Sequence, residues 1–359
     1  MHVYKEARPP AGKPPTILDV ASEAGVSKST VSNVVRGVAG VSDETRVKVR
    51  AAIDKLGYRP NVMARQLVQQ RTNILGVVVG DLANPFFAEM AKLVERHAAS
   101  RGYTAMFCNT EGDRQSELAG VETLLEYRVA GIVFLAVSAE SSTLRETLEH
   151  KVPVVFIGCH EDWGDVVSVD DVRGGRLGTD YLINAGHRRI AFLSIPELEG
   201  RSDLARLQGY KEAMRQSGLE PPVRIRWSPP SEHVTIEGVE RGLRAMFTGP
   251  DRITAVFASN DFAAIYLQEF ADRVNLRVPG DVSIIGFDDV AMAGLARIGL
   301  TTVAQPREEL ARQGIAALVE RIDGKRTGPA RASFVGVELV ARNSTAPNSN
   351  RDPGGRKES

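Results

Sequence analysis

The sequence predicts an α/β protein with two unlike parts, a small helical unit at the amino end and a long body of alternating strands and helices. Short helices with capping residues and glycine stops are predicted between residues 16 and 57. After residue 72, apolar runs of strand length recur between amphipathic stretches. A chain of 359 residues with 43% hydrophobic content exceeds one domain and can bury a substantial core.

The first predicted helix begins after Thr16, which stands three residues before Asp19 in the pattern of a capping box with Asp in place of Glu. Gly25 ends this helix, because glycine adopts a positive φ without steric cost. Ser27 then caps a second helix after a very short turn. Two helices joined by so short a turn containing glycine are typical of the helix-turn-helix unit. A third helix, beginning at Ser42, is predicted to pack on the other two.

The second helix carries the residues that we expect to meet DNA, because the second helix of such a unit presents its first residues to base edges in the major groove. Lysine can read guanine, asparagine can read adenine, and hydroxyl groups suit phosphates. The alternative is a small three-helix module without this role. The candidate DNA-binding residues of the unit are Thr16, Ser27, Lys28, Ser29, Thr30, Ser32, Asn33, Arg36 and Tyr58.

Charge is distributed unevenly along the chain. Residues 1–71 carry 12 Lys and Arg against 6 Asp and Glu, a net charge of +6. The rest of the chain carries 33 basic and 39 acidic residues, a net charge of −6, so the overall zero conceals a basic end on an acidic body. This distribution is expected when only one end of a protein meets phosphates.

Five motifs, in order along the chain, resemble the LacI/GalR family of bacterial transcription regulators. They are D-V-A-S-E-A-G-V-S-K-S-T-V-S-N-V from residue 19, L-G-Y-R-P-N from 56, N-P-F-F from 84, G-H-R-R-I-A-F-L from 186 and S-I-I-G-F-D-D from 283. The resemblance implies a DNA-binding headpiece followed by a body with the periplasmic-binding-protein fold. Many members carry Arg where this chain has Asn33, and Asn is frequent where it has Arg36. The base preference of a relative therefore does not transfer.

The segment after the headpiece resembles the hinge helix of the family. Residues 61–67 have helix-forming composition, but so short a helix is unstable alone in water because nucleation is costly. The resemblance implies that two hinges of a homodimer pair in the minor groove, where Leu67 of each is wedged into the central base step. The alternative is a plain linker whose leucine packs on the body. The candidate minor-groove residues are Asn61, Ala64, Arg65 and Leu67.

The alternation of strands and helices in the body implies parallel sheets built from βαβ units. The predicted strands are Ile74–Val79, Ala105–Cys108, Gly131–Leu135, Val154–Ile157, Ile190–Leu193, Ala255–Ala258 and Val282–Gly286. The predicted helices include Phe87–Ala99, Gln115–Tyr127, Gly174–Asn184, Ala205–Gln216, Ile236–Met246 and Phe262–Arg273.

With the resemblance, this pattern predicts two Rossmann-like subdomains with a cleft between them, and three crossings, near Asp170, Ala304 and Gly336. Subdomain one would take residues 72–170 and 305–335, and subdomain two would take 171–304 and 336–342. The chain would then comprise a flexible extension (1–15), a headpiece (16–60), a hinge or linker (61–71), an effector-binding and dimerisation domain (72–342) and a polar tail (343–359), predicted to be disordered.

Ligands of open parallel sheets bind beyond the carboxyl ends of the strands, and the family matches imply effector contacts there. Asp288 and Arg206 would bind hydroxyl groups or ring heteroatoms by charge-assisted hydrogen bonds, and Asn260 offers both a donor and an acceptor. Structural alternatives are a loop cap for Asp288, an internal ion pair for Arg206, a core position for Phe87 and a helix cap for Asp170. The candidate effector-binding residues are Asp81, Phe86, Phe87, Arg206, His233, Asn260 and Asp288.

These residue types favour a neutral polyhydroxylated effector, a sugar or sugar derivative, with a nucleobase or nucleoside, or a phosphoprotein corepressor, as alternatives. The resemblance implies a homodimeric regulator, most simply a repressor, that binds a near-palindromic DNA operator. An architectural DNA-binding protein that senses nothing fits a body of this size poorly.

Other function classes lack their sequence signatures. The chain contains no G-x-x-x-x-G-K-[ST], G-x-S-x-G or H-E-x-x-H motif, so we expect neither an enzyme nor a cofactor or metal site. The amino terminus lacks the apolar core of a signal peptide, and no apolar run is long enough to span a bilayer, which predicts a cytoplasmic protein. Cys108 and Cys159 lie far apart without metal-ligand spacing, so buried free thiols are expected.

Overall fold

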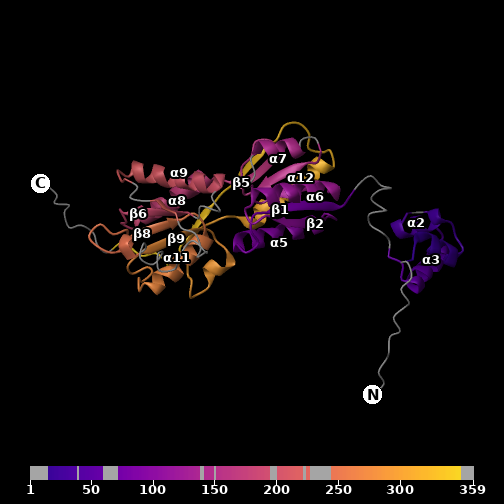
Figure 1. Cartoon of the computed structure of the whole chain (residues 1–359), viewed down its shortest axis with the longest axis horizontal. Coiled ribbons are helices and arrows are strands. Elements are labelled where there is room, and N and C mark those ends of the chain that lie inside the picture. The colour runs from indigo at the N-terminus through magenta and orange to yellow at the C-terminus, as the bar shows by residue number, and fades with distance from the viewer. Residues whose placement is uncertain are drawn as a thin grey trace, which may run out of the picture. The chain divides into compact units, whose positions relative to one another are not determined.

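The computed structural model describes residues 15–38, 40–59, 72–137, 141–148, 151–194, 200–220, 224–226 and 244–348 (Figure 1). The chain divides into two units, Met1–Thr72 and Asn73–Ser359. Several predicted features lie wholly or partly outside the described residues. They are Asn61, Ala64, Arg65, Leu67, His233, the side chain of Arg36 and most of the predicted helix Ile236–Met246.

The amino-terminal unit consists of three helices, α1 (Ile17–Ala24), α2 (Lys28–Arg36) and α3 (Asp43–Leu56). Hydroxyl side chains of Thr16, Ser27 and Ser42 cap them by accepting hydrogen bonds from backbone amides of the first turn. A glycine with positive φ ends each helix, as the sequence predicts for α1 and α3. The apolar faces meet in a small core of Val20, Ala21, Val31, Val34, Val49 and Ala52.

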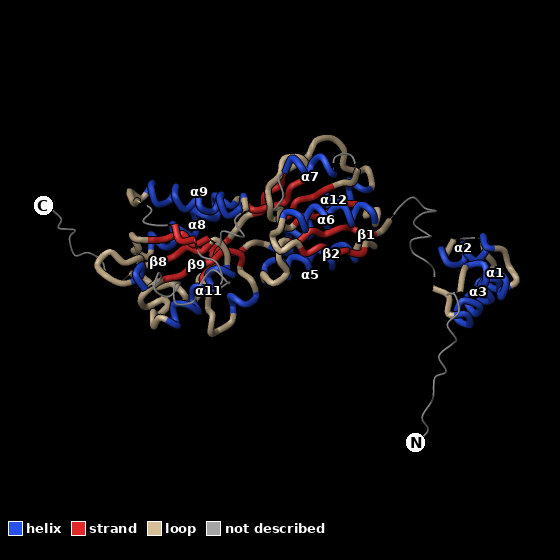
Figure 2. Tube along the Cα trace, viewed as in Figure 1, coloured by secondary structure: helices blue, strands red, loops and turns tan. Residues whose placement is uncertain are grey.

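The second unit contains two six-stranded sheets flanked by helices (Figure 2). The strand order is β11-β5-β4-β3-β1-β2 in sheet A and β12-β10-β9-β8-β6-β7 in sheet B. Sheet A comprises β1 (Ile74–Val79), β2 (Thr104–Asn109), β3 (Gly131–Phe134), β4 (Val154–Ile157), β5 (Asp165–Val169) and β11 (Ala332–Val335). Sheet B comprises β6 (Ile190–Ser194), β7 (Arg224–Arg226), β8 (Ala255–Ala258), β9 (Ser283–Asp288), β10 (Thr301–Ala304) and β12 (Glu338–Val340).

Neighbouring strands pair in parallel except β10 with β12. This pattern needs a crossover helix between most strands, and the helices supply it. With sheet A lie α5 (Pro85–Ala99), α6 (Arg114–Glu126), α7 (Ser141–Leu148) and α12 (Arg307–Ile322), which together form subdomain one. With sheet B lie α8 (Asp171–Asn184), α9 (Arg201–Gln216), α11 (Asp261–Arg273) and the 3-10 helix η2 (Ala291–Gly294), which together form subdomain two.

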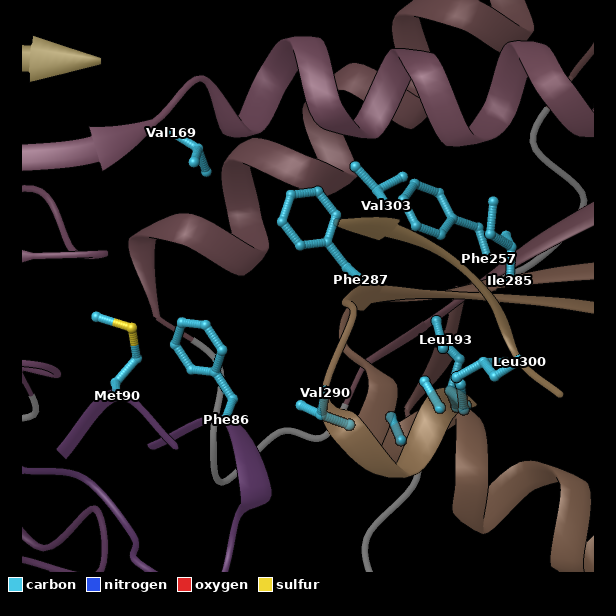
Figure 3. Close-up of a cluster of buried hydrophobic side chains, with 14 of the residues drawn as sticks. Phe86, Met90, Val169, Leu193, Phe257, Ile285, Phe287, Val290, Leu300 and Val303 are labelled. Atoms are coloured by element: carbon cyan, nitrogen blue, oxygen red, sulfur yellow. The ribbon is translucent and has the colours of Figure 1, made fainter. Parts of the chain in front are cut away.

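The chain passes between the two sheets three times, between β5 and α8, between β10 and α12, and between β11 and β12. A hydrophobic cluster continues across the junction. In Figure 3, Phe86 from α5 of subdomain one lies between Met90 of the same helix and Phe287 and Val290 of subdomain two, and all four belong to one cluster. The two subdomains therefore share part of one core.

The predicted disordered tail is wrong for residues 343–348, which pack on subdomain two. The Ser344 carbonyl accepts a 2.8 Å hydrogen bond from the Ile284 amide, and the Asn348 amide donates a 2.8 Å bond to the Ala185 carbonyl. The Ser344 side chain, 2% exposed, donates to the Ile284 carbonyl at 2.6 Å. Polar composition concealed this packing because backbone and hydroxyl groups, rather than apolar side chains, make the contacts.

None of the described helices combines the length and the apolar character needed to cross a bilayer. The described residues also contain no group of three His, Cys, Asp or Glu side chains arranged to hold a metal ion. Both cysteines are free thiols and half-buried, and burial raises the pKa of each.

Candidate functional site

The start of α2 presents a small polar surface on the headpiece. Ser27, Lys28 and Ser29 are exposed, and the Ser27 hydroxyl lies 2.7 Å from that of Ser29 and 2.8 Å from that of Thr30. Because Ser27 also caps the helix, its position is fixed relative to the amide groups of the first turn. A hydrogen-bonding surface at a helix amino terminus suits a phosphate or a base edge.

The other described headpiece candidates make contacts within the headpiece, and of Thr16, Ser32, Asn33 and Tyr58 only Thr16 is exposed. Ser32 and Asn33 are half-buried, and each takes part in an interaction within the protein. Thr16 forms a 2.7 Å hydrogen bond to the Asp19 carboxylate in the predicted capping box. Tyr58 packs against the headpiece core. These residues therefore have structural roles beside the DNA-binding roles that we expect.

Arg206, on α9, lies at the junction of the two subdomains and is 6% exposed. Its Nε donates to Asp171 at 2.8 Å, and its Nη1 donates to the Ser259 carbonyl at 2.7 Å. The same Nη1 lies 4.0 Å from the Asp288 carboxylate, and the guanidinium carbon lies 3.8 Å above the centre of the Phe287 ring. The guanidinium thus fixes the positions of several groups at the carboxyl end of sheet B.

Asp288 ends β9 and is 2% exposed. Its side chain accepts a 2.7 Å hydrogen bond from Gln305 Nε2, and its carbonyl accepts one from Arg307 at 2.6 Å. Its φ of 129° is rare for a residue with a side chain, and such strained positions cluster at functional sites. Burial, reinforced by the Asp261 carboxyl, holds the pKa of Asp288 well above its ordinary value despite Arg206.

Two further carboxyl groups have raised pKa values in this region. Burial raises the pKa of Asp261, the first residue of α11, to about 6, although it accepts hydrogen bonds from Thr302 Oγ1 at 2.5 Å and from the Val290 amide at 2.9 Å. Burial also raises the pKa of Asp203 on α9. We name Asp171, Asp203, Arg206, Asp261, Asp288 and Gln305 the junction cluster.

Unused hydrogen-bonding capacity accompanies this cluster. Gln305 is 5% exposed, and its Oε1 has no hydrogen-bond partner within the described part of the chain. Ser194 Oγ, at the carboxyl end of β6, is likewise buried without one. Because buried polar atoms are normally paired, Gln305 Oε1 and Ser194 Oγ are candidate contacts for a ligand.

Asp171, His160 and Gln305 were not among the sequence-predicted site residues. His160 follows β4 of subdomain one, and its Nε2 lies 2.9 Å from the Asp171 carboxylate at the start of α8. Burial opposes ionisation of Asp171, but Arg206 and His160 hold its pKa below the ordinary value. The sequence does contain a signal for Asp171, because two aspartates follow each other at the start of α8. Asp170 caps this helix, so the neighbouring carboxylate of Asp171 needs a different partner.

The remaining predicted effector residues have mixed placements. Asn260 is 7% exposed, its Oδ1 caps α11 by accepting from the Ala263 amide at 2.8 Å, and its Nδ2 donates to Ser259 Oγ at 3.5 Å. Phe86 is 8% exposed, and Phe87 packs half-buried beside it with the ring centres 5.5 Å apart. Asp81 accepts from the Ala83 amide in the turn after β1. The structure brings together Arg206 and Asp288 most closely.

A cavity of about 310 Å³ lies elsewhere in subdomain one, at the amino ends of β4 and β5. Trp163, Arg145, Asp165 and Arg321 contribute to its lining. None of the predicted effector residues lines it, so it is separate from the junction cluster.

Comparison with known proteins finds two families. Residues 16–61 match the model for bacterial regulatory proteins of the lacI family, and residues 179–345 match the periplasmic binding protein-like domain. The ribose operon repressor of Escherichia coli K12 is 36% identical over 315 residues, which cover 86% of this chain and 93% of the relative.

Solved structures agree with this relationship. The lac repressor dimer bound to operator and the anti-inducer ONPF has a TM-score of 0.79 and 26% identity, over 93% of this chain and all of that one. A LacI family transcriptional regulator from Enterococcus faecium with bound ribose has a TM-score of 0.66 and 26% identity, over 77% of this chain and all of that one.

Proposed function

Because this chain belongs to the lacI family of bacterial regulatory proteins, we propose that it represses transcription by binding a near-palindromic DNA operator as a homodimer under the control of a small molecule. The headpiece would contact the two halves of the operator, and the junction cluster would bind the effector. Ligand binding would change the relative position of the subdomains and so the ability of the two hinges to fold on DNA. Such coupling requires the ligand to favour one arrangement over the other.

The observation that carries the DNA-binding half is the exposed polar start of α2. Lys28 and Ser29 face solvent at the amino end of the second helix of a helix-turn-helix unit, which is the position that meets base edges and phosphates. The hinge candidates Asn61, Ala64, Arg65 and Leu67 are proposed, from the family resemblance, to contact the minor groove.

The DNA-binding proposal is tested by selecting an operator from randomised duplexes and measuring the affinity of variants for it. Lys28→Ala should weaken specific binding by about tenfold, since a base or phosphate contact is worth about 1–3 kcal/mol. Lys48→Ala is the matched control, because Lys48 is exposed on α3 and paired with Glu44. Equal effects of the two substitutions would contradict the proposed reading face.

The hinge proposal has its own test. Leu67→Ala should weaken binding to the selected operator far more than binding to random duplex, because an apolar wedge contributes only where the duplex is bent. Equal weakening of both kinds of binding would leave residues 61–67 as a plain linker.

For the effector we propose a sugar or sugar derivative. The junction cluster combines a guanidinium, carboxyl groups of raised pKa and a carboxamide with an unpaired oxygen, beside the rings of Phe86 and Phe287. Hydroxyl groups both donate and accept hydrogen bonds, so a polyhydroxylated ligand can match this mixture of donors and acceptors. A nucleobase or nucleoside is the second candidate, because aromatic rings beside an Asp and an Arg also suit a heterocycle. A phosphoprotein corepressor is the third.

A thermal-shift screen of pentoses, hexoses, nucleobases and nucleosides tests this choice, followed by operator binding with each compound that stabilises the protein. Stabilisation by sugars alone would support the first candidate, and stabilisation by nucleobases alone would replace it with the second. Weaker operator binding would mark the ligand as an inducer, and tighter binding as a corepressor. We expect the ligand to be recovered unchanged, because the proposed function is binding without turnover in the cytoplasm.

A further inference from the structure

The two subdomains are joined by hydrogen bonds in which His160 has a central place. His160 belongs to subdomain one, and its Nε2 lies 2.9 Å from Asp171 Oδ2 in subdomain two and 3.3 Å from Ser168 Oγ of its own sheet. Because an ionised carboxylate only accepts hydrogen bonds, Nε2 must carry the proton that reaches Asp171. The imidazole therefore donates across the junction.

The imidazole is held in place from several sides. Its ring stacks on Phe334 of β11, with the centres 5.9 Å apart and the planes inclined by 27°. The His160 carbonyl accepts from Arg201 of α9 at 3.3 Å, and Arg201 also lies 3.7 Å from Glu161. The charged groups that contact this residue and its neighbour are thus Asp171 from α8, Arg201 from α9 and Glu161 of its own loop.

Asp171 connects His160 to the other residues of the junction cluster. Its Oδ1 accepts from Arg206 Nε at 2.8 Å, while Oδ2 accepts from His160, so its two oxygens connect the two side chains. Arg206 in turn bonds to the Ser259 carbonyl and lies beside Asp288. The Asp171 side chain is 1% exposed and that of His160 is 27% exposed, so solvent reaches the chain of contacts at the imidazole.

We propose that His160 is a positioning residue of the effector site: it holds Asp171 across the junction, and Asp171 fixes the guanidinium of Arg206. Movement of subdomain one away from subdomain two removes the His160 donor and leaves Arg206 on a carboxylate that is free to turn. The inference rests on the proposed function only in so far as Arg206 contacts the effector.

The chain offers a matched control for this contact. His97 of α5 lies 2.9 Å from the Glu308 carboxylate on α12, the same distance as in the His160–Asp171 pair. Unlike that pair, His97 and Glu308 both belong to subdomain one. A substitution at His97 therefore removes the same chemistry without affecting the junction between subdomains.

The first test needs no effector. Hydrogen exchange of the full chain is measured at a single neutral pH for wild type, His160→Ala, His160→Gln and His97→Ala. His160→Ala should speed exchange about tenfold at the start of α8 and in the loop after β4. His160→Gln should restore protection, because its side-chain amide can donate to Asp171. His97→Ala should leave the protection of these segments unchanged.

The second test uses D-ribose and adenine as probes and compares their affinities for the same four proteins. His160→Ala should weaken binding of the probe that wild type takes by about tenfold, and His160→Gln by less. If wild type binds a probe and His160→Ala binds it equally well with unchanged exchange at α8, the positioning role is wrong. If wild type binds neither probe, D-ribose and adenine are excluded as effectors, while the exchange experiment still decides whether His160 controls the junction.

Discussion

Each subdomain buries a cluster of charge, and the two clusters combine aspartate and arginine in opposite proportions. In subdomain one, the Asp165 carboxylate is 2% exposed, accepts from Arg321 at 2.8 and 2.9 Å, and lies 3.0 Å from Nε of Arg326. In subdomain two, the Arg206 guanidinium bonds to Asp171 and lies near Asp288. Guanidinium groups are in excess in the first cluster, and carboxyl groups in the second.

The difference separates a structural cluster from a candidate binding site. Burial opposes ionisation of Asp165, but Arg321 and the Arg331 amide hold its pKa below the ordinary value, so the carboxylate is fully paired. In the junction cluster, by contrast, burial raises the pKa of Asp203, Asp261 and Asp288. Buried carboxyl groups of raised pKa, together with the unpaired Oε1 of Gln305, offer hydrogen-bonding capacity that a ligand can use.

The largest effect is expected from Arg206→Met, which leaves the junction carboxylates without their guanidinium. Removing one partner of a buried ion pair costs about 3–5 kcal/mol, so the free energy of unfolding in urea should fall by that amount. Arg312→Met is the control, because its guanidinium is exposed on α12 and pairs with Glu309 of the same helix. A similar loss of unfolding free energy in the two variants would mean that the excess of buried carboxyl groups does not destabilise the protein.

A second substitution asks whether close helix packing sets the geometry of the junction cluster. A β carbon at Gly209 would overlap the Val172 carbonyl, and one at Gly175 would overlap that of Arg206, so glycines let α8 and α9 approach backbone to backbone. Gly209→Ala should lower the free energy of unfolding by about 3 kcal/mol, near the upper end for overpacking. Gly336→Ala, where a β carbon has open space, should change it little. If Gly209→Ala leaves the free energy of unfolding unchanged, the position of Arg206 does not depend on the close contact between α8 and α9.

The pH dependence of stability should have opposite signs in the two clusters. The raised pKa of Asp261, about 6, gives a contribution that is complete below pH 4 and is lost as pH rises through 6, on the order of 2 kcal/mol. The lowered pKa of Asp165 gives a contribution that is present at neutral pH and is lost as pH falls below the ordinary pKa of aspartate.

Urea unfolding between pH 3 and pH 7 measures both slopes. Asp261→Asn should flatten the loss between pH 4 and pH 6, and Asp165→Asn should be most destabilising at neutral pH and least at pH 3. Parallel profiles for the two variants would remove the distinction between the clusters.

The smallest effect is expected from Arg326→Met in subdomain one. Arg326 Nε lies 3.0 Å from Asp165 but without hydrogen-bond geometry, and Arg321 already bonds to both carboxylate oxygens. The free energy of unfolding should therefore fall by no more than about 1 kcal/mol. A loss as large as that of Arg206→Met would show that Asp165 needs both guanidinium groups.

The fold was largely predictable because its signals are local. Caps at Thr16, Ser27 and Ser42 predicted the headpiece helices, and continuous apolar runs such as Ile74–Val79 predicted the buried strands. The elements absent from the prediction, among them β5, β11 and β12, are short or expose part of their side chains, or lie at chain crossings. These strands form because they pair with strands distant in the sequence, and a local sequence pattern does not reveal such pairing.

The sequence predicted the location of a candidate site residue only where that residue follows directly from the end of a strand or the start of a helix. Asp288 and Arg206 lie at the carboxyl end of sheet B, as expected, but both are already engaged by groups of the protein. His160 and Asp171 come from different sheets and lie 2.9 Å apart, a juxtaposition that only the folded chain creates. Asn260 matched its predicted location, yet half of its carboxamide serves to cap α11.

Residues 343–348 also determine where the chain can be truncated or fused to another protein. A cut after Arg342 would remove the Ser344 acceptors of the Ile284 and Thr301 amides and the Ala346 carbonyl that His187 and Ser283 contact. Water would then have to satisfy these polar groups. A reporter fused beyond residue 348 would keep those bonds. The practical boundary of the second unit therefore lies several residues past its last strand.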